Sequence, residues 1–312
     1  MRAEYAADVT RRYSTFVKVP AGVQIVKSAS GPSDDDYHWM EVMMRDAGRQ
    51  FDSIGLHYYT ITGTWAKKGS ATQFDEAEYA KTLQATLRID DYVTRHSAIM
   101  DKYDPKKRVW LAIDEWGAWY DTEPGTNPAF LFQQNTLRDA LVAALNINIF
   151  VKHADRVKMA NIAQMINVLQ AMILTKDEKM VLTPTYQVFE MFKQYQDATA
   201  LAVDVKSPWY SKEGSTLPAI SASAVRDQAG AVHVGLVNVD PVHAVAVVAK
   251  LDGISAGSAV TARVLTAGAV NAHNTFERPT EVKPGPFAGA VMEPGLLKVV
   301  LPPKSIVMVD VQ

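Results

Sequence analysis

Glu115 closes an apolar run that begins at Val109, and two tryptophans, Trp116 and Trp119, follow it closely. A buried strand that ends in a carboxylate delivers that group to the carboxyl edge of a sheet, where barrel enzymes hold their catalytic residues. Flat aromatic rings beside it, at Trp116 and Trp119, can stack on a sugar. A carboxylate in such a place can attack an anomeric carbon, as in a retaining glycosidase. The segment therefore predicts a glycosidase nucleophile at Glu115, against the alternative of a surface carboxylate that only closes a strand.

Two further candidates follow the preceding apolar run, 52–57. Tyr59 could donate its hydroxyl to Glu115 and orient the carboxylate for attack. The alternative for Tyr59, a core tyrosine with a satisfied hydroxyl, is about as favourable on spacing alone. His57 meets the same choice between a substrate-binding and a structural role, and the structural role is favoured for it.

Asp114 and Gln164 complete the polar residues at the predicted strand ends. Strand alternation predicts that Asp114 and Glu115 point in opposite directions, which makes Asp114 a structural group. Gln164 follows the apolar run 157–163 and could hydrogen-bond a substrate hydroxyl. An ordinary amide at a strand end is the alternative for Gln164.

The composition excludes several classes of partner. The 312 residues include 48% hydrophobic and 21% charged residues, and the net charge is −2. Such a chain has enough apolar material for one large domain, alone or with a smaller one. The near-neutral charge provides no basic stripe for phosphate backbones and no polybasic run for anionic lipid. Neither nucleic acid nor a membrane is therefore expected as a partner.

The chain contains no cysteine, which excludes disulfides, thiolate zinc sites and cysteine nucleophiles. Its seven histidines are scattered without the spacing of metal ligands. We find no phosphate-binding loop and no dinucleotide fingerprint. The sequence therefore predicts no metal and no cofactor.

The first residues, 1–8, lack the apolar core of a signal peptide. No window approaches the roughly 18 apolar residues of a membrane-spanning helix. On these grounds the sequence predicts a cytoplasmic protein.

Helical and strand patterns alternate up to about residue 200. Helices are predicted at 4–17, 37–47, 76–100 and 133–148 and from residue 184, and strands at 23–29, 52–57, 109–114 and 157–163. Such alternation predicts an α/β fold with a parallel sheet. Polar residues at the carboxyl ends of successive strands are typical of a (β/α)8 TIM barrel, of which four strands are half.

The pattern changes after residue 200 to short alternating runs punctuated by Gly, Pro, Asn and Asp. This pattern is typical of an antiparallel β-sandwich. We therefore expect two domains: the second half of a catalytic barrel at 1–199 and a C-terminal β-sandwich at 200–312.

These residues resemble glycoside hydrolase family 51, the α-L-arabinofuranosidases. The similar segments are 3–17 with its Tyr-Ala-Ala-Asp-x-x-Arg-Arg-Tyr pattern, 36–39, 55–59, 114–120, 160–167, 271–276 and 301–305. They run in order from the start of the chain to its end. The resemblance implies a retaining enzyme that removes terminal arabinofuranosyl groups from arabinan- or arabinoxylan-type oligo- and polysaccharides.

The resemblance also implies roles for individual residues. The Glu of the Asp-Glu-Trp motif is the nucleophile and corresponds to Glu115. Tyr59 corresponds to the active-site tyrosine, Gln164 to a substrate-binding glutamine, and Trp119 to a tryptophan on the leaving-group side. Bacterial members of the family are commonly intracellular and often hexameric, which implies a homo-oligomer.

The chain departs from the family at the general acid/base. That residue is the Glu of a Gly-Asn-Glu motif, which this chain lacks, and Met1 aligns just after it. The chain thus resembles the carboxyl-terminal three-fifths of the enzyme, barrel strands 5 to 8 and the sandwich. Asp35, Asp36 and Glu41 follow the first predicted strand, but capping of a helix explains them. We therefore expect weak or absent activity from this chain alone.

Two alternatives stay open. An open half barrel exposes apolar strand edges, so the chain could be a non-catalytic or partner-complemented fragment. A nucleophile and a tyrosine alone do not define the sugar, so a related β-glycan hydrolase of endoglucanase or xylosidase type is the other alternative.

Overall fold

The computed structural model describes residues 1–254 and 258–312, which form two compact units. Each unit combines segments that are distant in the sequence. The first comprises Met1–Tyr59, Arg88–Trp116 and His153–Ile162, and the second Thr60–Leu87, Gly117–Lys152 and Ala163–Gln312. The expected domain boundary near residue 200 stays a prediction.

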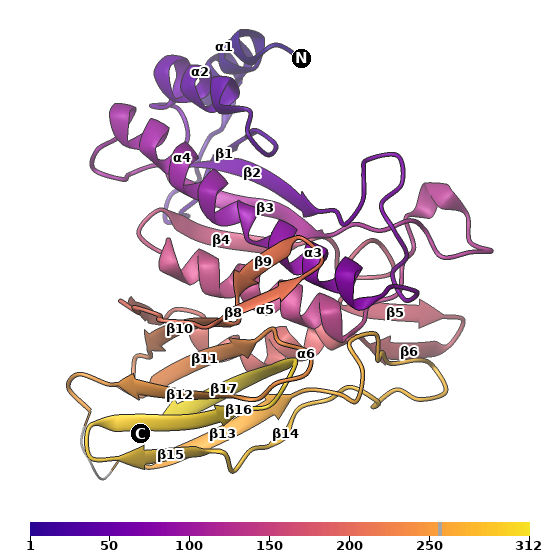
Figure 1. Ribbon diagram of the computed structural model, residues 1–312. Coiled ribbons are helices and arrows are strands. Elements are labelled where there is room, and N and C mark those ends of the chain that lie inside the picture. The colour runs from indigo at the N-terminus through magenta and orange to yellow at the C-terminus, as the bar shows by residue number, and fades with distance from the viewer. Residues whose placement is uncertain (255–257) are drawn as a thin grey trace. The chain divides into compact units, whose positions relative to one another are not determined.

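The sheet of the first unit has the strand order β1-β2-β3-β4 (Figure 1). Its strands are β1 (Ser28–Ala29), β2 (Ser53–Thr60), β3 (Trp110–Ala118) and β4 (Val157–Ile162). The pairs β1–β2 and β3–β4 are parallel. Gly31 lets the chain after β1 approach β2 closely, because a Cβ there would lie 1.5 Å from the carbonyl oxygen of Gly55. Figure 1 shows β2 and β3 side by side, so that residues late in each strand are neighbours.

Helices α1 (Ala3–Tyr13), α2 (Tyr37–Ala47) and α4 (Arg88–Tyr103), with the short 3₁₀ helix η1 (Ser14–Phe16), complete the first unit. Helix α2 packs between α1 and α4 through methionines such as Met40 and Met43, which are fully buried. Its N-cap is Asp36, whose carboxylate accepts a hydrogen bond from the Trp39 amide at 2.9 Å. The capping role expected for Asp36 is thus confirmed.

Two predicted elements differ in extent. The helix expected at 76–100 is interrupted at Leu87, between α3 (Glu76–Thr86) and α4. The hydroxyls of Thr82 and Thr86 donate to the carbonyls four residues earlier, a contact that bends helices. The strand expected at 23–29 is reduced to β1, because only Ser28 and Ala29 pair with β2.

The described residues of the second unit include α3, further helices and 3₁₀ helices, and a pair of separate two-stranded sheets. These are α5 (Leu137–Lys152), α6 (Pro184–Met191), η2 (Pro128–Phe130) and η3 (Lys193–Tyr195), with hairpins of β5 (Ile173–Lys176) and β6 (Lys179–Leu182) and of β8 (Trp209–Lys212) and β9 (Ser215–Pro218). Helix α5 begins four residues later than expected. Gln133 lies before it and uses its side-chain amide to bind the backbone of Ala118 and Tyr120.

From residue 199 onward, the strands of the second unit pair in antiparallel sheets, as the sequence predicts (Figure 1). One sheet has the order β14-β13-β17-β11-β10-β7 and the other β12-β16-β15. Their bounds are β7 (Thr199–Leu201), β10 (Ile220–Arg226), β11 (Val232–Asn238), β12 (Val245–Lys250), β13 (Val260–Leu265), β14 (Gly285–Pro286), β15 (Ala290–Glu293), β16 (Leu296–Leu301) and β17 (Ser305–Val311). Side chains from both sheets, among them Val234, Leu297 and Val309, form one hydrophobic core. Two sheets around a shared core are the architecture of a sandwich.

Candidate active site

Tyr59, the last residue but one of β2, contacts Glu115 in the second half of β3. The Tyr59 hydroxyl donates a hydrogen bond to Oε2 of Glu115 at 3.0 Å. The Glu115 side chain keeps 46% of its surface exposed, so its carboxylate is held at one oxygen and still accessible. A carboxylate that is oriented by a hydrogen bond and accessible to solvent has the geometry that a catalytic nucleophile needs before substrate binds.

His57 lies between two carboxylates. Its Nε2 is 3.3 Å from Oδ1 of Asp114, and its Nδ1 is 3.7 Å from Oε2 of Glu115. Asp114 also accepts a hydrogen bond from the Leu56 amide at 3.1 Å, which ties β3 to β2. The imidazole therefore links the structural carboxylate of Asp114 to the accessible carboxylate of Glu115.

The expectation that Asp114 and Glu115 point in opposite directions is wrong, because both lie near the same imidazole. The ladder between β3 and β4 shifts register between Ile113 and Trp116. Such an irregularity interrupts the alternation of side chains and re-aims one of them. It brings both carboxylates of the pair to His57.

The surroundings of this cluster raise the pKa of its two hydrogen-bond donors, His57 and Tyr59. The hydrogen bond to Asp114 raises the pKa of His57, with the charges of Asp114 and Glu115 adding to the effect and burial opposing it. Burial, and then the charge of Glu115, raises the pKa of Tyr59 above its ordinary value. The phenol of Tyr59 is thus a hydrogen-bond donor at neutral pH.

The two tryptophans expected near the nucleophile differ in environment. Trp116 is only 1% exposed and belongs to the core of the first unit. Trp119 belongs to the second unit, where its ring lies 5.0 Å from that of Trp65 at an interplanar angle of 66°. Trp65 is 65% exposed, so this pair offers an aromatic surface to solvent.

Gln164 also belongs to the second unit and is exposed. The peptide bond that precedes it is cis. Its backbone N–H donates to the Val168 carbonyl at 3.1 Å, and its carbonyl accepts from the Met172 amide at 3.3 Å. The backbone at Gln164 is therefore held on both sides, while its side chain faces solvent.

Sequence reasoning missed two charged residues beside these groups. Asp34, with a φ of 51°, donates its backbone N–H to the His57 carbonyl at 2.9 Å, and its backbone carbonyl accepts from Nε2 of His96 at 2.8 Å. Burial and the charge of Asp35 raise the pKa of Asp34, and His57 opposes them. Lys68 lies beside the Trp65–Trp119 pair. Asp34 follows β1 by a few residues, as Gln164 follows β4, which is a signal that could have found it, whereas nothing in the sequence singles out Lys68.

Within the described residues, no group of three or more His, Asp or Glu side chains is placed to hold a metal ion. In the same part of the chain, no helix is both long and apolar enough to cross a membrane.

A carboxylate oriented in this way, by a tyrosine hydroxyl, is the kind of group that retaining glycosidases use as a nucleophile. The α-L-arabinofuranosidase C-terminal domain matches residues 114–305, and the chain belongs to this family. An intracellular exo-α-L-arabinofuranosidase of Bacteroides ovatus is 48% identical over the whole chain. An intracellular exo-α-(1→5)-L-arabinofuranosidase of Streptomyces lividans is 25% identical over 97% of the chain.

A solved structure supports the same relationship. The family 51 arabinofuranosidase of Xanthomonas axonopodis pv. citri has a TM-score of 0.98 and 54% identity over the whole chain. An α-L-arabinofuranosidase of Thermotoga maritima has a TM-score of 0.81 at 24% identity over 99% of the chain, and this likeness concerns the fold alone.

The chain is shorter than these relatives. It spans 61% of the Bacteroides protein, 46% of the Streptomyces protein and 63% of the Xanthomonas chain. The similarity is therefore to a carboxyl-terminal portion of a family 51 enzyme.

Proposed function

We propose that this chain carries the nucleophile half of a retaining exo-α-L-arabinofuranosidase site. The observation that carries the proposal is the 3.0 Å hydrogen bond from Tyr59 to Glu115 at the ends of neighbouring strands. Family membership and the names of the Bacteroides and Streptomyces relatives support arabinofuranosyl groups over the β-glycans of the alternative hypothesis.

In the proposed reaction, Glu115 attacks the anomeric carbon of a terminal arabinofuranosyl group and forms a glycosyl–enzyme intermediate. Tyr59 binds Oε2, which leaves Oε1 to form the bond. His57, protonated over an extended pH range, balances the charge of the neighbouring carboxylates. Tyr59 and His57 thus position the attacking carboxylate of Glu115. Water later hydrolyses the glycosyl–enzyme intermediate and releases the sugar.

The reaction also needs a second carboxyl about 5 Å from the first, which protonates the leaving oxygen and then deprotonates water. We propose that polypeptide beyond these 312 residues supplies it, since the relatives are longer. Apolar side chains at Phe16, Val23 and Val26 of the first unit are between 49% and 76% exposed, and a completing segment would cover them. The same observation supports the partner-complemented form of the alternative hypothesis.

The remaining site residues have proposed roles around this reaction. Trp119 stacks on the leaving part of the glycan, and Gln164 hydrogen-bonds a sugar hydroxyl. Trp116, because it is buried, anchors the strand that carries Glu115. The substrates are arabinan- or arabinoxylan-type oligo- and polysaccharides.

We further propose the architecture expected from the sequence. Residues 1–199 are the second half of a (β/α)8 barrel and residues 200–312 the C-terminal sandwich domain. The four-stranded sheet with its parallel pairs supports the first part, and the antiparallel sheets support the second. The names of the two relatives support an intracellular, cytoplasmic protein, and the homo-oligomer stays part of the proposal.

A covalent trap tests the nucleophile. A fluorinated aryl arabinofuranoside with a good leaving group needs little acid catalysis, so it should label this chain even without the second carboxyl. Mass spectrometry should locate the arabinosyl adduct on Glu115, and Glu115→Gln should abolish labelling. An adduct on another residue, or none with folded protein, would contradict the proposal.

Hydrolysis tests the missing acid. Turnover should be largest on aryl arabinofuranosides and poor on arabinan, whose leaving alcohol needs a proton. Addition of the separately produced amino-terminal portion of the Bacteroides relative should raise arabinan hydrolysis. Arabinan turnover by the chain alone at the rate of an intact enzyme would refute the argument.

A further inference from the structure

Trp65, Trp119 and Lys68 form a compact cluster in the second unit. The two rings lie 5.0 Å apart between centroids, close to edge-on. Nζ of Lys68 lies 5.0 Å from the centroid of Trp65 and 5.1 Å from that of Trp119. Both distances are within the range of a cation–π contact. The cluster thus joins one positive charge to two aromatic faces, and the Trp65 ring is largely exposed.

The loop that carries the cluster is held in place by its backbone. Thr64 and Lys67 exchange two backbone hydrogen bonds, of 2.8 and 3.1 Å, which close a tight turn around Trp65. The carboxylate of Asp121 accepts from the amides of Lys68 and Gly69, each at 3.1 Å. A surface fixed in this way loses little entropy when a ligand binds.

Lys68 keeps donors for a ligand. Its ammonium has three N–H groups, and one of them donates to the Trp65 carbonyl at 2.7 Å. Two acidic side chains lie beside this loop: both oxygens of Asp121 already accept backbone N–H groups, and Glu78, whose Oε1 lies near Gly69, accepts from the Asp75 amide at the start of α3. The positive charge can therefore attract an anionic group that arrives with a stacked ring.

We propose that Lys68 selects glycans whose leaving part carries a uronic acid, with the sugar ring stacked on the Trp65–Trp119 pair and its carboxylate paired with the ammonium. The placement on the leaving side rests on the proposed function, in which Trp119 follows the nucleophile. A neutral sugar would gain the stacking contact alone.

A bracing role for Lys68 is the competing explanation. If the ammonium only fixes the two rings, its loss should weaken acidic and neutral sugars equally. If it pairs with a carboxylate, its loss should weaken only the acidic sugar, and salt should have the same effect. The ratio of the two affinities separates the explanations.

The test is an NMR titration of the full chain that follows the indole N–H signals of Trp65 and Trp119. The ligands are trigalacturonate and its fully methyl-esterified form, which has the same rings without the charge. We expect tighter binding of the acid by about two- to fivefold, the range for one solvent-exposed ion pair. Lys68→Gln should abolish this preference, Lys68→Arg should keep it, and Lys67→Gln, in the same turn, should leave it unchanged.

Equal affinities for the two ligands in the wild-type chain, or a Lys68→Gln variant that keeps the preference, would overturn the proposal. An equal loss for both ligands would assign Lys68 to bracing and overturn it too. All titrations are repeated with Glu115→Gln, so that turnover cannot affect them. Failure of covalent labelling with intact acid preference would count against the proposed function alone, and successful labelling without preference would count against this inference alone.

Discussion

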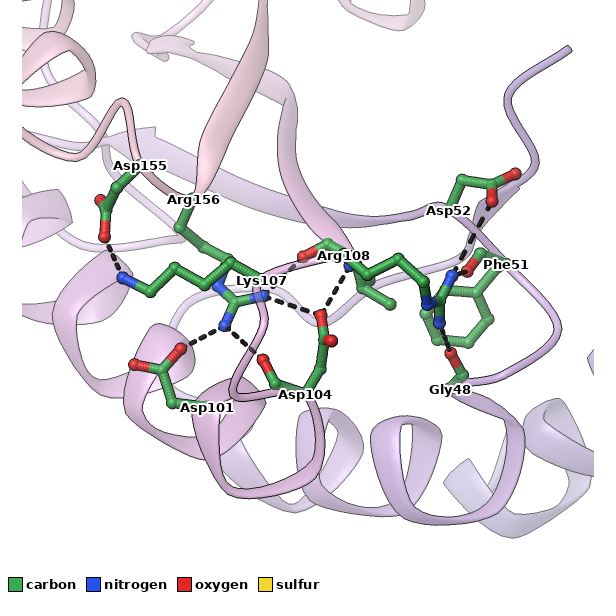
Figure 2. Close-up of polar contacts among 10 residues, drawn as sticks. Gly48, Phe51, Asp52, Asp101, Asp104, Lys107, Arg108, Asp155 and Arg156 are labelled. Carbon is green, nitrogen blue, oxygen red and sulfur yellow. Dashed lines mark hydrogen bonds and ion pairs between the residues drawn. The ribbon is translucent and has the colours of Figure 1, made fainter. Parts of the chain in front are cut away.

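The two ends of the sheet in the first unit hold charge in opposite ways. At the start of β4, Arg156 is 1% exposed and donates to the Val109 carbonyl at 2.6 Å, to the Asp104 carboxylate at 3.1 Å, and to the carboxylate of Asp101 (Figure 2). At the ends of β2 and β3, Asp114 and Glu115 keep 37% and 46% of their side-chain surface exposed.

The pKa values follow this difference. Burial works to raise the pKa of Asp104, but hydrogen bonds from the Val109 and Arg108 amides and from Arg156 outweigh it and lower the pKa. The carboxylate is thus charged and fully engaged. At the other end, Glu115 has an oxygen left for chemistry and His57 has a raised pKa.

In this sheet, charges at the strand starts stabilise the fold, and charges late in the strands remain accessible. Charges at the strand starts also join elements distant in the sequence where they are exposed: Arg108, 49% exposed, donates to the Phe51 carbonyl at 2.9 Å and lies 3.8 Å from Asp52 (Figure 2). Partly engaged charges at the strand ends contribute less to folding and can react with a substrate. Mutations at the two ends should therefore separate the two properties.

The largest effect is expected from Arg156→Met. It removes a buried cation and leaves Asp104 and the Val109 carbonyl without their partner, at a cost of about 3 kcal/mol in the free energy of unfolding. Urea denaturation measures the change. Arg49→Met, at an exposed arginine of the same unit, is the control and should change stability little. A loss below about 1 kcal/mol for Arg156→Met would contradict the statement that the buried charges at the strand starts stabilise the fold.

Tyr59→Phe should produce the converse result at the other end. Loss of a hydrogen bond to a charged acceptor costs about 1.5 kcal/mol, so the labelling of Glu115 should slow about tenfold. Stability should change by less than about 1 kcal/mol, because the Tyr59 hydroxyl bonds a half-exposed carboxylate. The rate of labelling, followed by mass spectrometry, gives the first number and urea denaturation the second. Tyr13→Phe, on an exposed face of α1, is the control.

Asp114→Asn tests the charge balance around His57. The variant removes the largest cause of the raised pKa, so the His57 ring should titrate at lower pH by NMR. A raised pKa in the folded state adds stability that is fully present below the unfolded pKa, about 6.5, and is lost as the pH rises through the folded pKa. The stability difference between wild type and variant should therefore shrink above that range. A pKa of His57 unchanged in the variant would assign its shift to Glu115 and Asp34 instead.

The features of the fold and of the site that depend on local sequence patterns could be predicted from the sequence. Tyr59 and Glu115 lie in the second halves of neighbouring strands, where such residues come together, and the hydrogen bond between them was one of the two interpretations that the sequence left open. The alternation of apolar and polar residues after residue 200 predicted the antiparallel sheets, and Asp36 predicted the N-cap of α2.

The remainder depends on contacts that no local pattern encodes. The register shift after Ile113 placed Asp114 and Glu115 beside the same imidazole, against simple alternation. The burial of Trp116 and the exposure of the Trp65 ring are outcomes of packing, although both are tryptophans near strand ends. The environments of Lys68 and Arg156 depend on partners distant in the sequence, Trp119 and Val109 respectively.

The smallest effect is expected from Lys107→Met. This variant separates the effect of burial from that of position, because Lys107 and Arg156 lie at the same end of the sheet but differ in exposure. Lys107 pairs with Asp155 at the same end of the sheet as Arg156 (Figure 2), but their side chains are 36% and 58% exposed. An exposed pair contributes about 0 to 1 kcal/mol and is screened by salt. Urea denaturation should show a loss within that range that disappears at high salt, with Lys106→Met as the control. A loss as large as that of Arg156→Met would mean that the position at the strand starts, and not burial, determines how much a charge stabilises this fold.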